Sequence, residues 1–237
     1  MSIKIIAYVG SNKNESATVK NVKGLLKKVE KGCQCQWEVI QSKDYIVNIC
    51  SGCNQCFLDG KCVYKDDFDK IYGKMLEADI IVWGSPVYVQ HVSGTMKNFI
   101  DRCAKEIYTL PLRGKLAITV SSSGGNGNGY VNEYMRKVLN MLGAYVIEDV
   151  AFTEFMNKEK LSFIYEKSSK KIIQTISSEC IMIDEFLEQR YAACKKTFDL
   201  YEDGNWIKKY WKKHNLFSFV TYAELIEHYR HNNILDN

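Results

Sequence analysis

The sequence lacks the features of an exported or membrane-embedded protein. It begins MSIKIIAYVG, without a charged and then apolar leader that ends in small residues, and no apolar run approaches the roughly 18 residues that cross a bilayer. We therefore expect a cytoplasmic protein that does not enter a membrane. The 32 basic and 28 acidic residues give a net charge of +4, far from the basic surface of a nucleic-acid-binding protein. No nucleic acid partner is expected.

Two nucleotide-binding motifs and a disulfide framework are also missing. No GxGxxG follows the first strand-like run, and no GxxxxGK[ST] occurs anywhere, which excludes the usual dinucleotide and P-loop fingerprints. The nine cysteines are odd in number, and in a reducing compartment they stay reduced unless they bind metal or do redox chemistry. The cysteines therefore raise the question of a metal site.

What the sequence does contain is a repeated strand, loop and amphipathic helix. Because parallel neighbours need helical crossovers, five such strands predict an α/β protein with a doubly wound, five-stranded parallel sheet in the order 2-1-3-4-5. The strand-like runs lie at 3–10, 37–41 and 78–86, at the start of 115–129, and at 144–152.

The C-terminal third has a different character. Residues 158–197 contain neither glycine nor proline and carry an apolar stripe, which predicts one long helix, bent or straight. Residues 198–237 are too rich in aromatic residues for a solvated end and are expected to pack on the body or on a second subunit. The expected domains are thus 1–157, with a cysteine-rich insertion at 50–66, then the helix and the aromatic arm.

Small polar residues follow the first, third and fourth strands, in loops at 10–18, 84–102 and 121–129. In an open α/β sheet, ligands bind beyond the carboxyl ends of the strands. The hydroxyls of the first loop, together with the amides of a helix N-terminus, suit a phosphate monoester. Each loop taken alone is equally well explained by turn and capping residues, but three at one edge favour a ligand.

The three loops resemble those of flavodoxin-like NAD(P)H-dependent FMN reductases; they read GSNKNESAT, GSPVYVQHVSGTMKNFIDR and SSSGGNGNG. The cysteine-rich segment resembles the insertion of the iron-sulfur flavoprotein branch and reads CSGCNQCFLDGKCVYKDD. The resemblance covers about residues 1–155 and implies a flavodoxin-like fold and bound FMN. It implies a phosphate site at Ser11, Lys13, Ser16 and Thr18, flavin-edge contacts at Pro86, Val87 and Tyr88, and closure of the other side by Ser122, Gly124 and Gly125.

Four cysteines share thirteen positions. The spacing Cys50-x2-Cys53-x2-Cys56-x5-Cys62 lets a loop place thiolates around a [4Fe–4S] cluster, and the resemblance implies that all four bind one cluster. Tetrahedral zinc would also accept four thiolates, and a loop without metal is the third possibility. The remaining cysteines are expected to be core or incidental thiols: Cys33, Cys35, Cys103, Cys180 and Cys194.

Other polar residues of the third loop are interpreted as structural. Asp101 and Arg102 lie on a predicted helix and are expected to form an ion pair rather than to do chemistry, and Lys97 matches the same family segment. His91 is expected to be a surface or packing residue, with a proton-donor role as the alternative.

The three loops and the four cysteines, with what the resemblance implies, predict an oxidoreductase that passes electrons between FMN and a [4Fe–4S] cluster. The alternatives are a cluster-free NAD(P)H-dependent FMN or quinone reductase, and a non-enzymatic electron carrier that docks a partner through WIKKYWKKH at 206–214. NAD(P)H is one candidate electron donor. A homodimer or larger homo-oligomer is expected, with a redox partner or a small-molecule electron acceptor.

Overall fold

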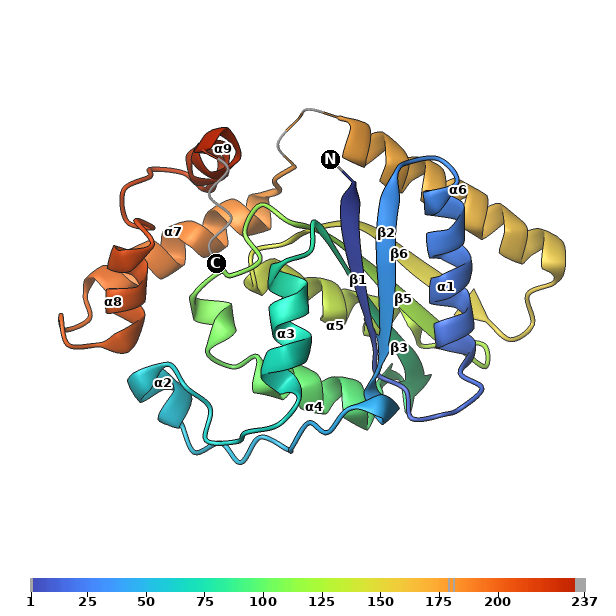
Figure 1. Ribbon diagram of the computed structural model, residues 1–237, viewed down its shortest axis with the longest axis horizontal. Helices are drawn as coiled ribbons and strands as arrows, with labels where there is room; N and C mark the ends of the chain where they lie inside the picture. Colours follow the sequence, from blue (N-terminus) through green and yellow to red (C-terminus); the bar gives the residue numbers. More distant parts are fainter. Residues whose placement is uncertain (1, 179, 181, 233–237) are drawn as a thin grey trace.

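The computed structural model describes residues 2–178, 180 and 182–232, and its centre is a twisted parallel sheet (Figure 1). The sheet order is β2-β1-β3-β5-β6, which is the predicted order of the five long strands. Neighbouring strands of this path are all parallel. The strands are β1 Ile3–Val9, β2 Cys35–Gln41, β3 Ile80–Tyr88, β5 Leu116–Ser123 and β6 Tyr145–Thr153.

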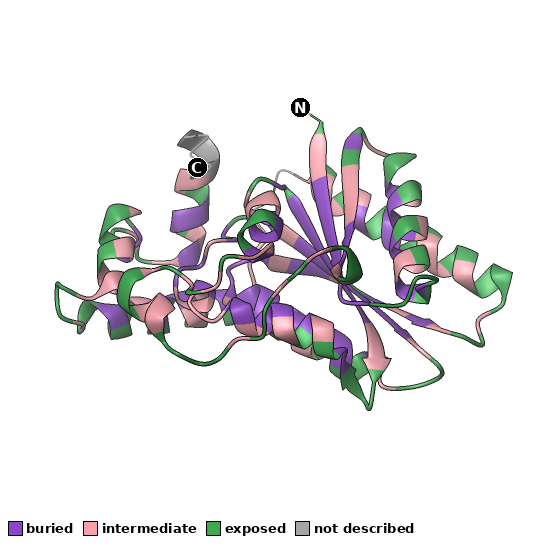
Figure 2. Ribbon diagram, turned by 60° about the horizontal axis from the view of Figure 1, so that its bottom comes forward, coloured by how far each residue is buried: buried purple, intermediate pink, exposed green. Residues whose placement is uncertain are grey.

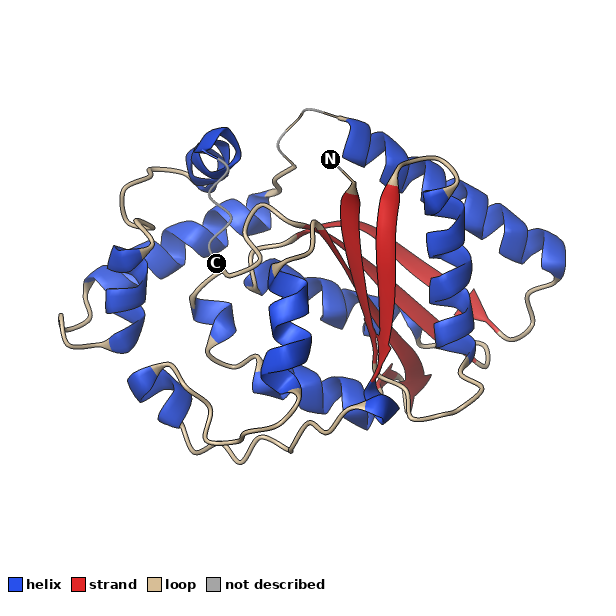
Figure 3. Cartoon of the chain, viewed as in Figure 1, coloured by secondary structure: helices blue, strands red, loops and turns tan. Residues whose placement is uncertain are grey.

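Helices cover both faces of the sheet, as Figure 3 shows. Helices α1 (Ala17–Glu30) and α6 (Lys158–Ser177) lie on one face, and α3 (Phe68–Leu76), α4 (Gly94–Arg102) and α5 (Asn128–Met141) lie on the other. The α/β, flavodoxin-like fold class is therefore confirmed.

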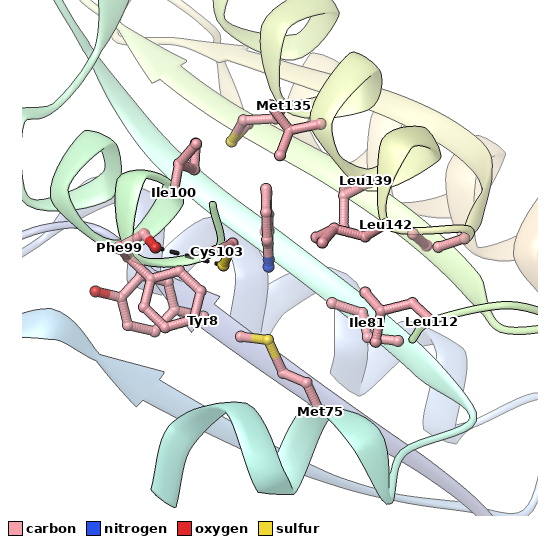
Figure 4. Close-up of a cluster of buried hydrophobic side chains, with 14 of the residues drawn as sticks. Tyr8, Met75, Ile81, Phe99, Ile100, Cys103, Leu112, Met135, Leu139 and Leu142 are labelled. Atoms are coloured by element: carbon pink, nitrogen blue, oxygen red, sulfur yellow. Dashed lines mark hydrogen bonds between the residues drawn. The ribbon is translucent and has the colours of Figure 1, made fainter. Parts of the chain in front are cut away.

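Successive side chains of β1 point to opposite faces of the sheet and so contribute to both layers. Ile5 and Val9 point into the apolar cluster shared with α1 and α6, while Ile6 and Tyr8 point into the cluster shared with α3, α4 and α5. Such a strand is apolar throughout because both of its faces are buried. Figure 2 shows the buried residues between sheet and helices. In Figure 4, Tyr8 and Phe99 of the second cluster stack, with ring centroids 4.1 Å apart.

A short strand at the end of β3 was not predicted. Strand β4 (His91–Val92) pairs antiparallel with β3 through a two-residue turn at Val89 and Gln90. Both turn residues have positive φ, 49° and 66°, as the tight hairpin turn that suits twisted strands requires. Asparagine and glycine are the usual residues there, so the sequence VQ gave no hairpin signal.

The prediction of one helix over 158–197 is wrong. Helix α6 ends at Ser177, and a separate helix α7 (Glu185–Asp199) begins where the Asp184 side chain accepts a hydrogen bond from Leu187 N (2.9 Å). The apolar stripe is divided between two cores: Ile172 packs on the sheet cluster, and Leu187 packs on a C-terminal cluster. One straight helix could not serve both.

The aromatic arm packs on the body of the same chain. It forms α8 (Trp206–Lys213) and α9 (Tyr222–Asn232), and residues 233–237 lie outside the described part. Trp211 Nε1 donates to Tyr108 O (2.7 Å), and the Tyr222 hydroxyl donates to Gly143 O (2.6 Å). Since Trp211 is fully buried, the segment 206–214 no longer supports the idea of a partner-docking arm.

The remaining elements are short. They are α2 (Gln55–Asp59) and the 3₁₀ turns η1 (Ser42–Asp44) and η2 (Glu106–Tyr108). Within the described residues, no helix is both long and apolar enough to span a bilayer.

We expect Trp211→Ala to lower the free energy of unfolding by about 3–5 kcal/mol, because it removes a fully buried indole and leaves a cavity in the C-terminal cluster. Urea unfolding followed by circular dichroism measures this loss. Phe163→Ala is the control: Phe163 is 67% exposed, and its loss should change the free energy by no more than about 0.5 kcal/mol. Equal effects of the two substitutions would contradict the packing of the arm.

Candidate functional site

The loop after β1 has the properties of a phosphate cradle. Ser11, Ser16 and Thr18 are buried, while Lys13 is exposed. Ser16 caps α1 by accepting from Val19 N (3.3 Å), and the first turn of α1 carries no acidic residue that would repel an anion. Val19 N is taken up by this cap, and the helical amides before it have no partner within the helix.

Gln41, at the end of β2, holds this loop in place. Its Nε2 donates to the carbonyl oxygens of both Ser11 (2.9 Å) and Lys13 (2.8 Å). Because the side chain is buried and both hydrogen bonds go to backbone, the loop conformation does not depend on its own exposed residues. The sequence pattern did not identify Gln41.

Ser93 connects the first loop with the second. Its hydroxyl donates to Gly10 O (2.5 Å) and its N–H donates to Ser85 Oγ (3.0 Å), so the ends of β1 and β3 meet at the start of α4. Gly10 is required at this contact, since an added Cβ would lie 2.5 Å from Met96 Cβ. Sequence analysis missed Ser93 because it lies 83 residues from Gly10.

The flavin-edge residues are the last three of β3, where the hairpin with β4 begins. Pro86 and Val87 are half-buried, and Tyr88 is exposed. The hairpin touches the glycine-rich loop, because Gln90 Nε2 donates to Asn126 Oδ1 (2.8 Å). A Cβ at Gly127 would lie 2.6 Å from Val87 Cγ1, so only glycine allows the two loops to meet there.

The third loop follows β5. Gly124 and Gly125 are exposed, but the Ser122 hydroxyl is buried and accepts from Asn21 Nδ2 of α1 (3.1 Å). Asn128 braces the loop from inside, donating to Ser121 Oγ (2.9 Å). Since β1, β3 and β5 are neighbours in the sheet, the three predicted loops lie at one edge.

The His91 side chain packs against a neighbouring ring. Its ring lies on Tyr134, with centroids 4.6 Å apart and the planes inclined by 55°. The pair lines a shallow surface cavity between the hairpin and α5. This agrees with a packing role.

A second site lies at the far end of α4. All four predicted cysteines, Cys50, Cys53, Cys56 and Cys62, line one cavity of about 70 Å³, together with Arg102 and other residues of α3 and α4. Positive φ at Gly52 (67°) and Asn54 (61°) turns the chain between the first three cysteines. In Figure 1 the cysteine loop runs along the lower edge, past α4 to α2.

The electrostatics of this cavity confirm that the thiols are neighbours. Burial is the largest cause that raises the pKa of the Cys56 thiol, and Glu106 raises it further. Cys62 and Cys50 also raise it, while the Lys105 ammonium lowers it. The net effect raises the pKa of Cys56, so its neutral thiol is favoured here, and Lys105 opposes this only in part.

A buried ion pair fixes the cysteine loop to the body. Arg102 contacts Asp66 with both terminal nitrogens, Nη1 to Oδ2 (2.5 Å) and Nη2 to Oδ1 (3.2 Å), and the side chains are only 1% and 2% exposed. Arg102 Nη1 also donates to Asn48 O (3.1 Å), so it holds the loop on both sides of the cysteines. Burial raises the pKa of Asp66, but the hydrogen bonds from Arg102 and Asn48 outweigh it and lower the pKa to about 2.

The prediction that Asp101 and Arg102 pair with each other is therefore wrong, because each forms an ion pair with another residue. Asp101 pairs with Lys97, one helical turn before it, with Nζ to Oδ1 at 2.5 Å. Consecutive helical residues point about 100° apart, so Arg102 faces the core where Asp101 faces solvent. The structural interpretation of both residues stands.

The other cysteines lie outside this cavity. Cys35, Cys103 and Cys194 are buried, Cys33 is half-buried and Cys180 is exposed. All nine thiols are free. Among the described residues, no group of three or more histidine, cysteine, aspartate or glutamate side chains converges closely enough for a single metal ion.

The two sites are joined by one helix. Ser93, at the start of α4, contacts the loops of the first site, and Arg102, its last residue, lines the cysteine cavity. The nine residues of α4 rise by about 13 Å. The structure therefore places a predicted flavin site and a four-thiol cavity about one short helix apart.

Comparisons with known proteins identify the family of this chain. A sequence model of the family described as NADPH-dependent FMN reductase matches residues 3–157, more than half of the chain. An iron-sulfur flavoprotein of Archaeoglobus fulgidus is 32% identical over 60% of this chain, and one of Methanocaldococcus jannaschii is 37% identical over 53%. The matches span 64% and 65% of these two relatives, slightly less than two thirds of their length.

Solved structures show the same fold. An apo NADH:FMN oxidoreductase superposes with a TM-score of 0.58 at 20% identity, covering 75% of this chain and 92% of that one. An archaeal flavodoxin superposes with a TM-score of 0.51 at 15% identity, covering 74% of this chain and all of the other. The fold agrees with the family model, and that model covers more than half of the chain: the chain belongs to the NADPH-dependent FMN reductase family.

Proposed function

We propose that this protein is an FMN-dependent oxidoreductase that passes electrons between FMN and a [4Fe–4S] cluster bound by Cys50, Cys53, Cys56 and Cys62. The observation that carries the proposal is the shared cavity of the four thiols at one end of α4, whose other end contacts the predicted flavin loops. Names of the curated relatives, iron-sulfur flavoproteins, support the same pairing of groups.

The residues of the first site fit FMN. Ser11, Ser16 and Thr18, with the first amides of α1, form the proposed phosphate site, and Lys13 supplies an exposed cation. No acidic residue of the first helical turn competes with the phosphate.

The ring of the flavin would lie between the second and third loops. Pro86, Val87 and Tyr88 supply a partly exposed apolar edge. Gly124 offers open space, with no atom within 4 Å of an added Cβ, and Gly125 is likewise exposed. Ser122 holds the third loop to α1 through Asn21, so its proposed contribution is to position the loop beside the flavin.

Bound FMN supplies the two-electron chemistry, and the protein determines where it lies and what surrounds it. The three loops bind and orient it, while Gln41 and Ser93 keep them in register with the sheet. The Gly125 amide is engaged within the loop, where it donates to Ser123 Oγ (3.1 Å), and other backbone or hydroxyl donors of residues 121–125 beside the ring would bias its charge state.

The four cysteines that line one cavity are the observation that supports a cluster. A tetrahedral zinc ion holds its four sulfurs about 2.3 Å from one centre, whereas a cluster holds them at separate corners. The thiols here surround a common cavity without converging on one point. The adjacent cations Arg102 and Lys105 would partly offset the negative charge of four thiolates.

A cluster-free NAD(P)H-dependent FMN or quinone reductase is the second candidate. The family match favours it, because NADPH-dependent FMN reductase describes the whole of residues 3–157 without reference to a cluster. In that case the four cysteines would form a lid over the end of α4. NADH, NADPH or a protein would then be the electron donor.

We also propose a homodimer or larger homo-oligomer in the cytoplasm, with a redox partner or small-molecule acceptor. Large apolar side chains stand exposed around the cysteine loop, as expected of a surface that another chain covers. They are Ile46 (72% exposed), Ile49 (78%), Leu58 (72%) and Val63 (53%).

Anaerobic purification with reconstitution should give one FMN and about four irons and four sulfides per chain. Cys56→Ser should lose at least 90% of the iron and sulfide and keep the flavin, because it removes one of the four proposed ligands. Chemical assays and the absorbance spectrum measure both. The control Cys180→Ser, an exposed thiol outside the cavity, should keep its cluster. Flavin without iron in the wild type would establish the simple reductase instead.

Ser16→Ala should weaken FMN binding roughly tenfold, because it removes a hydroxyl from the proposed phosphate site, and cost about 1 kcal/mol of stability from the lost cap. Flavin fluorescence titration measures the dissociation constant. Asn157→Ala is the matched control: it removes the side-chain cap of α6 (2.8 Å to Lys160 N), should cost similar stability, and should leave FMN affinity unchanged. Equal FMN affinity of both variants would remove Ser16 from the phosphate site.

A further inference from the structure

Arg102 has one donor that the structure leaves unused. Among the described residues, its Nε is a buried side-chain nitrogen without a hydrogen-bond partner, although Nη1 and Nη2 are both engaged with Asp66 and Nη1 also with Asn48. Leaving such a donor unpaired costs about 1–3 kcal/mol, so buried donors in native proteins nearly always have an acceptor. The missing acceptor calls for an explanation.

The Cys62 sulfur is a candidate acceptor. Arg102 and Cys62 line the same cavity. Burial lowers the pKa of Arg102, but Asp66 and, to a smaller degree, Cys62 raise it above its usual value, in agreement with the cavity that Arg102 and Cys62 share. A neutral thiol is a poor acceptor, whereas a thiolate on a metal is a strong one.

We propose that Arg102 donates its Nε–H to the Cys62 sulfur when the cavity holds a cluster, and that this bond raises the reduction potential of the cluster. The inference rests on the proposed function and deepens it, because it names a residue that tunes the site rather than one that binds it. Hydrogen bonds to cluster sulfurs are among the means by which proteins set such potentials.

The direction of the effect follows from charge. The guanidinium stays protonated, and adding an electron to the cluster makes its sulfurs more negative. The hydrogen bond is therefore stronger to the reduced cluster than to the oxidised one, so it favours reduction. Asp66 opposes part of this effect with its own negative charge, but it bonds to the two Nη atoms and leaves Nε directed elsewhere.

The surroundings hold Arg102 in one orientation. The guanidinium lies 4.9 Å from the ring centre of Phe68 and 5.3 Å from that of Tyr64, and the fork to Asp66 fixes its plane. Lysine would keep the charge but has neither the fork nor Nε–H. Arg102→Lys therefore removes the Nε–H donor and keeps the positive charge.

The test is the reduction potential of the reconstituted cluster, followed by electron paramagnetic resonance during a redox titration. Arg102→Lys should make reduction about tenfold less favourable, which is a shift of about 59 mV to lower potential for one electron. Arg190→Lys is the matched control: Arg190 also has a buried, unpartnered Nε, but it contacts Ile107 and Tyr108 under the C-terminal helices, and its replacement should not move the potential.

Asp66→Asn distinguishes tuning from a purely structural role. It breaks the same ion pair but keeps Nε–H and removes a negative charge, so the potential should rise. If Arg102 only holds the loop, both substitutions should lower cluster content, and Arg102→Lys, which keeps the charge, should not shift the potential of the clusters that remain. That result would overturn the inference.

A measurement on the wild type covers the case in which Arg102→Lys does not retain a cluster. Protein labelled with ¹⁵N at arginine should show a weak coupling between the reduced cluster and one nitrogen, since Arg102 is the arginine that lines the cavity. A loaded wild type without this coupling would overturn the inference and leave the proposed function intact. A wild type that takes up no iron would instead overturn both.

Discussion

Arg102 and Asp66 form an ion pair that is withdrawn from water, and the position of the cysteine loop depends on it. Arg102 comes from the end of α4, and Asp66 follows the last cysteine of the loop. Asp66 also accepts from Asn48 N and Nδ2 (2.8 and 2.9 Å), so one carboxylate joins the start and the end of the insertion. Removing either partner would leave a buried charge uncompensated, at a cost of about 3–5 kcal/mol.

Much of the frame could be predicted from the sequence because its signals are local. Each long strand is a short apolar run, and each helix has an apolar face at a 3.6-residue spacing, so the strand order followed from the number of crossovers. The site loops were predictable for the same reason: small polar residues follow Val9 at the end of β1 and begin within the last residues of β5, which ends at Ser123, and four cysteines fall within thirteen positions.

The rest depends on contacts between residues far apart in the chain. Ser93 meets Gly10 across 83 residues, Arg102 meets Asp66 across 36, and Asn21 meets Ser122 across 101. Periodicity carries no information about such pairs. The break after Ser177 was hidden for a related reason: the apolar stripe continues in the sequence, but its two halves pack on different clusters. Composition reveals that a residue is buried, not what buries it.

Helix α4 gives the two sites a fixed relation. Since Gly10 tolerates no side chain against Met96 and Arg102 is anchored at the other end, the helix has no freedom to slide along its axis. Electron transfer slows steeply with distance. A rigid helix between the two sites would therefore hold the rate of transfer steady while surface loops fluctuate. One residue inserted into α4 would lengthen the separation by about 1.5 Å and rotate one site by about 100° relative to the other. The chain is therefore expected to accept length changes in its loops and arm far more readily than in these nine residues.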